Sequence, residues 1–434
     1  MPSYVPNTEQ DRVAMLATLG LPSVDALFAD IPPAIRDLPL SLPAGLSELE
    51  LQREMSRLAE KNLAIDRTPC FLGAGAYRHF VPSVVGHITS RSEFYTAYTP
   101  YQPEISQGTL QTIFEFQSMM CELTGMEVAN SGMYDGATAL AEAALMACRV
   151  TGRSKVAALS TVSRAWREVV STYSEGQSIA QDLFEPDQVT LDESFACLLV
   201  QYPNFFGYLE DLAAWEEAAH RVGALLVVAV GLAPLGLLKP PGAFGADIVV
   251  AEGQPFGQPP SFGGPYVGVF CCREGLVRQM PGRIVGRTAD AQGRTGYVLT
   301  LQTREQHIRR ERATSNIWTS QALVALAATV HLASLGPQGL REVAELCYHK
   351  AHYLAERVAA LSGYSLPLQG AFFHEFVIRC PVAPGEVNRR LLEAGILGGL
   401  DVSDQIDNGL LLCCTELNTR DEIDRLVGEM GKIA

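Results

Sequence analysis

The fold is decided by the stretch Ala224-Leu225-Leu226-Val227-Val228-Ala229-Val230 and, after a loop, by Asp247-Ile248-Val249-Val250-Ala251. In both runs apolar residues follow one another without alternation, which predicts strands that are buried on both faces. Outward from this stretch, similar runs occur at residues 156–160, 196–201, 266–271 and 297–302, and helical patterns separate the runs at residues 136–149, 165–172 and 209–221. Because buried strands alternate with helices, we expect an α/β domain whose mostly parallel sheet carries helices on both faces.

The chain is expected to consist of three parts. Residues 1–61 are predicted to form an N-terminal helical arm with capping boxes at Thr8 and Ser47, too short for a core of its own, which should pack on a larger body or on another subunit. Residues 62–319 are predicted to form the large α/β domain. Residues 320–434 are predicted to form a small C-terminal α+β domain, with helices at 320–335, 339–361, 384–394 and 421–430 and strands at 372–379 and 409–414.

Composition excludes several classes of protein. Of the 434 residues, 47% are hydrophobic and only 19% are charged, which is enough apolar material for large cores and excludes a disordered chain. The formal net charge of −15 argues against nucleic acid or an anionic membrane surface as a partner. Ten cysteines without a Cys-x-x-Cys pair, mostly inside apolar runs, predict buried reduced thiols in a cytoplasmic protein.

No targeting or membrane segment is expected. The N-terminus lacks a basic segment followed by an apolar run, so no signal peptide is visible. The longest uncharged stretch, residues 223–238, is interrupted by glycine and proline and is shorter than the roughly 20 residues that span a bilayer.

A second informative stretch is Glu93-Phe94-Tyr95-Thr96-Ala97-Tyr98-Thr99-Pro100-Tyr101-Gln102-Pro103-Glu104-Ile105-Ser106-Gln107-Gly108, which leads into a helix predicted at 109–124. The two prolines fix φ and favour extended residues before them, so a stiff extended loop is predicted. Its three tyrosines, spaced by three residues, suit contact with another surface, although they could also pack on their own domain.

Other motifs carry no chemistry. Residues 73–75, Gly-Ala-Gly, lack the third glycine of a dinucleotide fingerprint and predict a turn. His349 and His352 are expected on a solvated helix face, and His374-Glu375 lacks the second histidine of a zinc helix, so no metal site is expected. An ion-paired surface is predicted for the basic group Arg304, Arg309, Arg310 and Arg312.

Three blocks resemble the P-protein of the glycine cleavage system, specifically its N-terminal half, which some organisms make as a separate subunit 1. The blocks are residues 94–108, Pro281-Gly282-Arg283-Ile284-Val285-Gly286, and Leu301-Gln302-Thr303-Arg304-Glu305-Gln306-His307-Ile308-Arg309-Arg310-Glu311-Arg312-Ala313-Thr314-Ser315-Asn316. The resemblance implies a fold-type I architecture, as in enzymes that use pyridoxal 5′-phosphate (PLP), with a mixed, mainly parallel seven-stranded sheet and a small C-terminal domain. It also implies a reaction in which glycine loses CO2 on PLP and its aminomethyl group passes to the lipoyl arm of the H-protein.

PLP chemistry requires a lysine that forms an imine with the cofactor. The position similar to the family's lysine is Gln254, whose amide cannot form an imine. The best rival, Lys239, is followed by two prolines and adjoins no phosphate-binding turn. The chain has only five lysines, Lys61, Lys155, Lys239, Lys350 and Lys432.

The other cofactor positions also depart from the family. Where the resemblance implies an aspartate for the ring nitrogen, the chain has Gly231. The nearest candidates for the ring-stacking residue are Ser163 and Arg164. Asp135, in the first turn of a helix, would repel a phosphate. We therefore expect this degenerate site to hold no PLP, and we expect no catalytic residue within this chain alone.

Fold-type I sites form at subunit interfaces, so the resemblance implies an obligate partner, a PLP-carrying subunit 2, in an assembly expected to be α2β2. We expect Tyr95, Tyr98, Tyr101 and Gln102 to reach the partner's site. The turn at residues 312–316 resembles the Arg-Ala-Gly-Thr-Glu-Asn turn of related enzymes, which implies that Thr314 or Ser315 bonds the partner's PLP phosphate. Two alternatives remain open: a self-sufficient fold-type I aminotransferase or decarboxylase, and a purely structural scaffold subunit.

Overall fold

The computed structural model describes residues 7–36, 38, 41–317 and 319–433. Main-chain contacts divide the chain into two units, Met1–Ala64 and Ile65–Ala434. Residues 1–6, at the start of the predicted arm, lie outside the described residues. The division at residue 64 lies close to the predicted end of the arm, and the predicted boundaries at 61 and 319 stay predictions.

The first unit consists of short helices joined by irregular chain. They are α1 (Glu9–Leu19), a 3-10 turn (Val24–Phe28), α2 (Pro33–Arg36) and α3 (Glu48–Ala59). Both predicted capping boxes are present, Thr8 with Asp11 and Ser47 with Glu50. None of the described residues between 7 and 64 is buried, so the helices share no core of their own.

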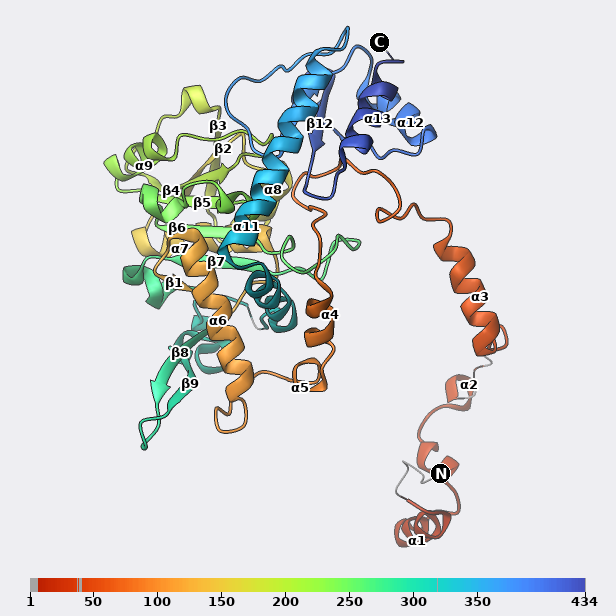
Figure 1. The fold of residues 1–434 in the computed structure, drawn as a ribbon. Helices are drawn as coiled ribbons and strands as arrows, with labels where there is room; N and C mark the ends of the chain where they lie inside the picture. Colours follow the sequence, from red (N-terminus) through yellow and green to blue (C-terminus); the bar gives the residue numbers. More distant parts are fainter. Residues whose placement is uncertain (1–6, 37, 39–40, 318, 434) are drawn as a thin grey trace. The chain divides into compact units, whose positions relative to one another are not determined.

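The second unit is built on a seven-stranded sheet with the strand order β1-β7-β6-β5-β4-β2-β3 (Figure 1). Strands β3, β2, β4, β5 and β6 run parallel, whereas β7 runs antiparallel to both β6 and β1. This confirms the predicted mixed, mainly parallel sheet of seven strands. The strands are β1 (Val128–Ala129), β2 (Lys155–Leu159), β3 (Ala180–Phe184), β4 (Phe195–Tyr202), β5 (Leu225–Val230), β6 (Ile248–Glu252) and β7 (Gly268–Cys272).

The central strands are buried as their sequence predicted. Every residue of β5 except Leu225, and every residue of β6 except Glu252, is buried. Helix α7 packs across β4 to β7, and α9 packs against β5. The helices of this region are α4 (Ser83–Thr89), α5 (Ser92–Tyr95), α6 (Gln107–Thr124), α7 (Gly136–Thr151), α8 (Arg164–Glu175) and α9 (Leu212–Arg221).

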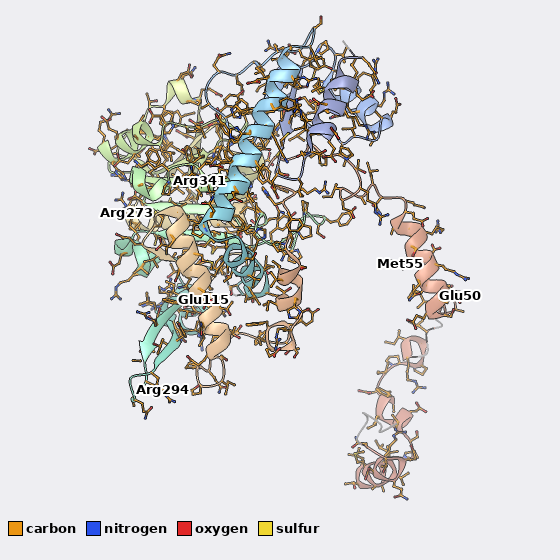
Figure 2. The ribbon with its side chains drawn as sticks, viewed as in Figure 1. Glu50, Met55, Glu115, Arg273, Arg294 and Arg341 are labelled. Atoms are coloured by element: carbon orange, nitrogen blue, oxygen red, sulfur yellow. The ribbon has the colours of Figure 1, made fainter. Side chains whose placement is uncertain are left out.

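Two local predictions differ from the structure. The segment predicted as a strand at 297–302 forms β9 (Thr295–Thr300), which pairs with β8 (Ile284–Ala289) in a separate hairpin outside the main sheet. Figure 2 labels Arg294 in the hairpin connection, where its guanidinium pairs with Asp290 at 2.7 Å. The predicted extended loop begins with the helical turn α5, because Pro100 restricts only the residue before it and not the chain five residues upstream.

The C-terminal elements match the predicted α+β pattern. Helix α11 (Ala322–Ala359) is broken at Gly336, whose φ of 63° and ψ of 179° are not helical, so it is two helices, as predicted. A three-stranded antiparallel sheet follows, with the order β10-β12-β11. Its strands and flanking helices are β10 (Glu375–Arg379), α12 (Pro384–Glu393), β11 (Leu400–Asp401), β12 (Gly409–Cys413) and α13 (Arg420–Met430).

Helix α11 is long and apolar enough to cross a membrane by length and composition, with a mean hydropathy of 1.3 over its most apolar window. Half of that window is buried inside the fold. Burial of this kind, together with the break at Gly336, is typical of the core helix of a globular protein.

Candidate functional site

A cavity that is open to solvent lies where the parallel strands β4, β5 and β6 end. Ligands of open α/β sheets bind at this carboxyl edge. The strands contribute Gln201, Gly231 and Glu252, and distant parts of the chain contribute Tyr77 and Glu375. This is the place where the resemblance put the cofactor.

Gln254 is fully buried beside this cavity, and every hydrogen-bonding group of its amide is used. Its Oε1 accepts a hydrogen bond from the main-chain N–H of Tyr77 at 2.8 Å. Its Nε2 donates to the main-chain oxygens of Tyr77 at 2.8 Å and Gln258 at 2.7 Å. Gln254 therefore ties the loop after β6 to the segment around Tyr77, which is a structural role.

Carboxylates fill the N-terminus of α7, which is the position where a phosphate would bind. Asp135 is the N-cap of α7 and accepts from the N–H of Thr138 at 2.8 Å. The next N–H, that of Gly136, donates to Oε2 of Glu252 at 3.0 Å, and Oε1 of Glu252 accepts from the N–H of Gln254 at 3.0 Å. Burial raises the pKa of Glu252 to about 7. Glu252 thus takes the donors that would otherwise be available to an anion.

An indole ring closes the same end of the cavity. Trp166 lines the cavity, and a Cβ added to Gly136 would lie 2.3 Å from the Trp166 ring, so the ring packs directly on the main chain of α7. Arg164, the position assigned from sequence to ring stacking, instead has a side chain that is 63% exposed and pairs with Glu168 and Asp404. Trp166, two positions later on α8 and therefore on a different face of the helix, packs against the buried core.

The described residues of this cavity do not fit PLP. No lysine lines it among the residues that the structure describes. Lys155 pairs with Asp182, Lys350 donates to the main-chain oxygen of Glu416, and Lys239 lies over the ring of Phe244. Gly231 follows β5 without a side chain that could reach a pyridine nitrogen, and the helix N-terminus is already occupied by carboxylates.

The three blocks that carry the resemblance meet in a second region. Nη2 of Arg283, from the second block, donates to the hydroxyl of Tyr101 in the first block at 2.9 Å. Nε of Arg283 also lies 3.2 Å from Oε2 of Glu305 in the third block. The Tyr101 ring packs edge-on against the His307 ring, with 5.4 Å between the ring centroids. Contacts within the chain therefore hold Tyr101, which is 39% exposed.

The rest of the tyrosine loop is more accessible. Tyr95 is 69% exposed, Tyr98 is 81% exposed, and Gln102 is exposed. Tyr95 and Tyr98 border a groove that is completed by residues of α6 and α11, among them Ile113 and Leu326. The two tyrosines can contact another molecule without any change in this fold.

The turn at residues 312–316 is partly engaged within the chain. The hydroxyl of Ser315 donates to Oε1 of Glu142 on α7 at 2.8 Å, whereas Thr314 is half-buried and lines a neighbouring cavity with Arg149. Of the two hydroxyls predicted to reach the partner, that of Thr314 is the less constrained. Arg304 is not part of an ion-paired surface: it is buried and donates to the main-chain oxygens of Met280 and Gly282, which fixes the Pro-Gly-Arg turn.

Sequence reasoning identified Gln254 and Gly231 but missed Trp166, Glu252 and Tyr77. Glu252 and Trp166 are close in sequence to residues that were identified, and Trp166 is the first aromatic residue of α8. An aromatic residue at the start of a helix that follows a sheet strand is the signal that could have found it. Nothing in the sequence near Tyr77 points to residue 254, because 177 positions separate the two.

Comparisons with known proteins identify the family of this chain. The family model described as "Glycine cleavage system P-protein" matches residues 2–430. The chain is 55% identical over 445 residues to the "Probable glycine dehydrogenase (decarboxylating) subunit 1" of Desulforamulus reducens, covering 99% of this chain and all of the relative. It also matches a solved structure of glycine decarboxylase (P-protein) of the glycine cleavage system in inhibitor-bound form, with a TM-score of 0.93, 42% identity and full coverage of both chains.

A more distant structure shows the fold alone. The sphingosine-1-phosphate lyase of Burkholderia pseudomallei aligns with a TM-score of 0.63 and 15% identity over 92% of this chain and 93% of that one. The architecture is therefore that of fold-type I PLP-dependent enzymes, as predicted. The chain belongs to the glycine cleavage system P-protein family.

Proposed function

We propose that this chain is the subunit of glycine dehydrogenase (decarboxylating) that carries no PLP of its own. In this proposal it pairs obligately with a subunit 2 that holds PLP and decarboxylates glycine, and the aminomethyl group passes to the lipoyl arm of the H-protein. The curated relative is named subunit 1, which supports the existence of a partner subunit. This chain by itself is then inactive.

The observation that carries the proposal is the state of the cavity at the ends of β4 to β6. The amide of Gln254 is committed to three hydrogen bonds, and at the start of α7 the N–H of Gly136 donates to Glu252 and that of Thr138 to Asp135. The absence of a lysine from one position, taken alone, could mean that the lysine that forms the imine lies elsewhere in the chain. Here the position assigned to the amine and the expected phosphate site have both been taken over by side chains that stabilise the fold.

The contribution of this chain is then made across the subunit interface. Loss of CO2 leaves an electron pair on the glycine carbon, and water would protonate it, so the site has to be closed to solvent. The exposed rings of Tyr95 and Tyr98 are suited to wall off such a site and to donate from their hydroxyls. Thr314 is the better-placed hydroxyl for a phosphate of the partner's cofactor, because Ser315 already donates to Glu142.

We further propose that the assembly is α2β2 and cytoplasmic. An obligate interface of this kind buries on the order of 2,000 to 5,000 Å² in total. The helical arm exposes apolar side chains such as Val13, Leu19 and Leu42, which are candidates for this contact.

The proposal is tested in the complex of this chain with subunit 2. Tyr98→Phe removes one hydroxyl and should lower kcat by about two- to tenfold, since one hydrogen bond contributes about 0.5–1.5 kcal/mol. Tyr98→Ala also opens the wall to water and should lower kcat further. Leu392→Ala, on the exposed face of α12, is the matched control and should leave turnover unchanged.

Turnover is measured as CO2 release from glycine in the presence of lipoylated H-protein, and assembly is measured by size-exclusion chromatography with light scattering. Full turnover by both Tyr98 variants in an intact complex would favour a purely structural scaffold. Turnover by this chain without subunit 2 would favour a self-sufficient PLP enzyme and would overturn the proposal.

A further inference from the structure

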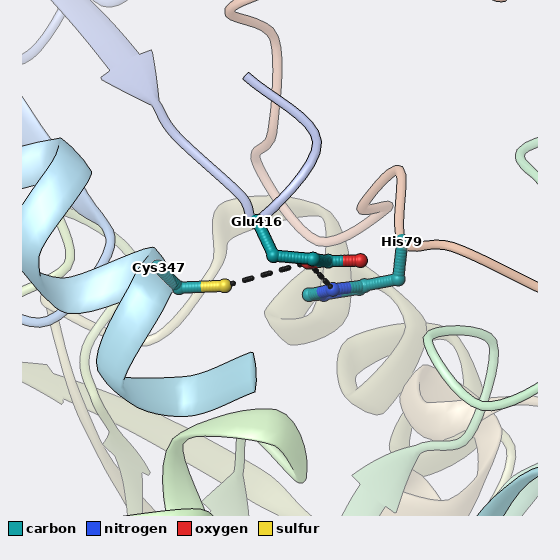
Figure 3. A group of neighbouring side chains, drawn as sticks. All are labelled: His79, Cys347 and Glu416. Atoms are coloured by element: carbon teal, nitrogen blue, oxygen red, sulfur yellow. Dashed lines mark hydrogen bonds and ion pairs between the residues drawn. The ribbon is translucent and has the colours of Figure 1, made fainter. Parts of the chain in front are cut away.

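Three side chains with metal-binding atoms meet in the interior of the second unit (Figure 3). His79 lies in the segment before α4, Cys347 lies on the second half of α11, and Glu416 lies in the loop between β12 and α13. One ligand atom from each residue lies within 4.8 Å of the other two. No part of the proposed function uses this cluster.

The three side chains are buried and in direct contact through Glu416. Nδ1 of His79 lies 2.7 Å from Oε2 of Glu416, and Sγ of Cys347 lies 3.6 Å from the same oxygen. The side chains of His79 and Glu416 are 4% and 9% exposed, and Cys347 is fully buried. Nε2 of His79 is also buried and has no hydrogen-bond partner among the described residues.

We propose that His79, Cys347 and Glu416 bind a zinc ion. Imidazole nitrogen, thiolate sulphur and carboxylate oxygen are the three donor types that Zn²⁺ takes in proteins, at about 2.0–2.3 Å and in tetrahedral geometry. Three protein donors leave a fourth position for water. The ion ties together three segments of the chain, one before α4, one on α11 and one after β12, so its role is to stabilise the fold.

Zinc bond lengths at tetrahedral angles place neighbouring donor atoms about 3.3–3.7 Å apart. The separation of Cys347 Sγ and Glu416 Oε2 already falls in that range. The contact between His79 and Glu416 is a hydrogen bond and has to lengthen by about 0.6 Å when the metal displaces the shared proton.

Zinc binding to the Cys347 sulphur releases a proton. In the free form the thiol donates toward Oε2 of Glu416, and zinc binding replaces that S–H bond by a bond to the metal and releases the proton to solvent. The other carboxylate oxygen, Oε1, accepts from the N–H of Phe80 at 2.6 Å, which holds the carboxylate in place.

Two neutral imidazole rings and one ammonium group lie around the cluster. Burial and the charge of His79 lower the pKa of His331 to about 4 and that of His374 to about 3, so both rings are neutral at pH 7. Each also has a buried Nδ1 without a hydrogen-bond partner among the described residues. The ammonium group of Lys350 donates to the main-chain oxygen of Glu416 at 2.5 Å, and its positive charge weakens the site for a dication.

The test uses the full chain, stripped with a chelator and then titrated with Zn²⁺ or Co²⁺ alone. We expect one metal ion per chain, a rise in the thermal unfolding midpoint with Zn²⁺, and a thiolate-to-Co(II) charge-transfer band. Cys347→Ser should weaken Zn²⁺ binding at least about tenfold and abolish the band. Cys380→Ser, which changes a buried cysteine outside the cluster, should alter neither. Lys350→Gln should tighten Zn²⁺ binding by removing the adjacent charge.

The unaltered chain provides a readout that does not depend on how the variants fold. X-ray absorption of its zinc form should show one sulphur among nitrogen and oxygen neighbours. A chain that retains no zinc after titration, a coordination shell with no sulphur or with two, or a Cys347→Ser chain with an undiminished Co(II) band would each overturn the proposal.

Discussion

Restoring the missing amine by Gln254→Lys should not restore cofactor binding, because the fold has taken over the space around it. The lysine would enter a fully buried position whose amide now makes three hydrogen bonds. Its ammonium can still donate to the main-chain oxygens of Tyr77 and Gln258. It cannot accept from the N–H of Tyr77, and Glu252 and Trp166 still fill the end of the cavity at the start of α7.

The expected loss of stability follows from these contacts. An unpaired buried N–H costs about 1–3 kcal/mol. Desolvation of the ammonium adds several kcal/mol, which the two carbonyls and the nearby Glu252 partly offset. We expect the free energy of unfolding to fall by about 3–5 kcal/mol in total. Gln111→Lys, at an exposed position on α6 where Glu115 can pair with the new charge, should stay within about 0.5 kcal/mol of the parent.

Urea unfolding followed by circular dichroism measures the loss, and visible absorbance after addition of PLP measures imine formation. The reasoning fails if Gln254→Lys is as stable as Gln111→Lys. It also fails if Gln254→Lys develops an imine band that borohydride abolishes, because the cavity would then still accept the cofactor.

Three further predictions concern the same unit. Burial raises the pKa of Glu375 from 4.5 to about 7. The stabilising contribution of its protonated form is therefore complete below pH 4.5 and is lost as the pH rises to 7. Glu375→Gln should remove about 3 kcal/mol of this pH dependence from the free energy of unfolding, measured in unfolding titrations at several pH values. Tyr101→Phe should lower the free energy of unfolding in urea by about 1–3 kcal/mol, because the largely buried Arg283 loses a hydrogen-bond acceptor. A change smaller than about 0.5 kcal/mol would contradict that role of the Tyr101 hydroxyl. Gly136→Ala should lower the free energy of unfolding by about 1–3 kcal/mol, because the new methyl group would clash with the indole ring of Trp166. The control is Gly86→Ala on α4, where a methyl group meets no neighbouring atom, and it should leave the stability unchanged or raise it in the same assay.

The sequence predicted the fold best where apolar residues follow one another without interruption. The runs that became β5 and β6 have no polar residue inside them, so burial on both faces could be predicted directly. Strand β3 (Ala-Gln-Asp-Leu-Phe) lies at the edge of the sheet, is nowhere buried, and gave no such signal. Strand β1 has only two residues. Edge strands are stabilised by pairing more than by their own apolar pattern, and local patterns therefore miss them.

The candidate site shows the same limit. That Gln254 replaces the family's lysine could be predicted from the resemblance, but its bonds to Tyr77 join residues 177 positions apart. The cluster of His79, Cys347 and Glu416 has no sequence spacing that a metal motif would reveal, since the segment before α4, helix α11 and the loop after β12 bring it together only in the folded chain.

The central claim is that no side chain of this protein holds PLP. The most direct measurement is to incubate the purified, unaltered chain with PLP, reduce it with borohydride, and quantify pyridoxyl-lysine by peptide mass spectrometry at Lys61, Lys155, Lys239, Lys350 and Lys432. We predict no stoichiometric adduct at any of the five, while the PLP-carrying partner treated in the same way is labelled once per chain. A single lysine of this chain that is labelled to completion would contradict the account.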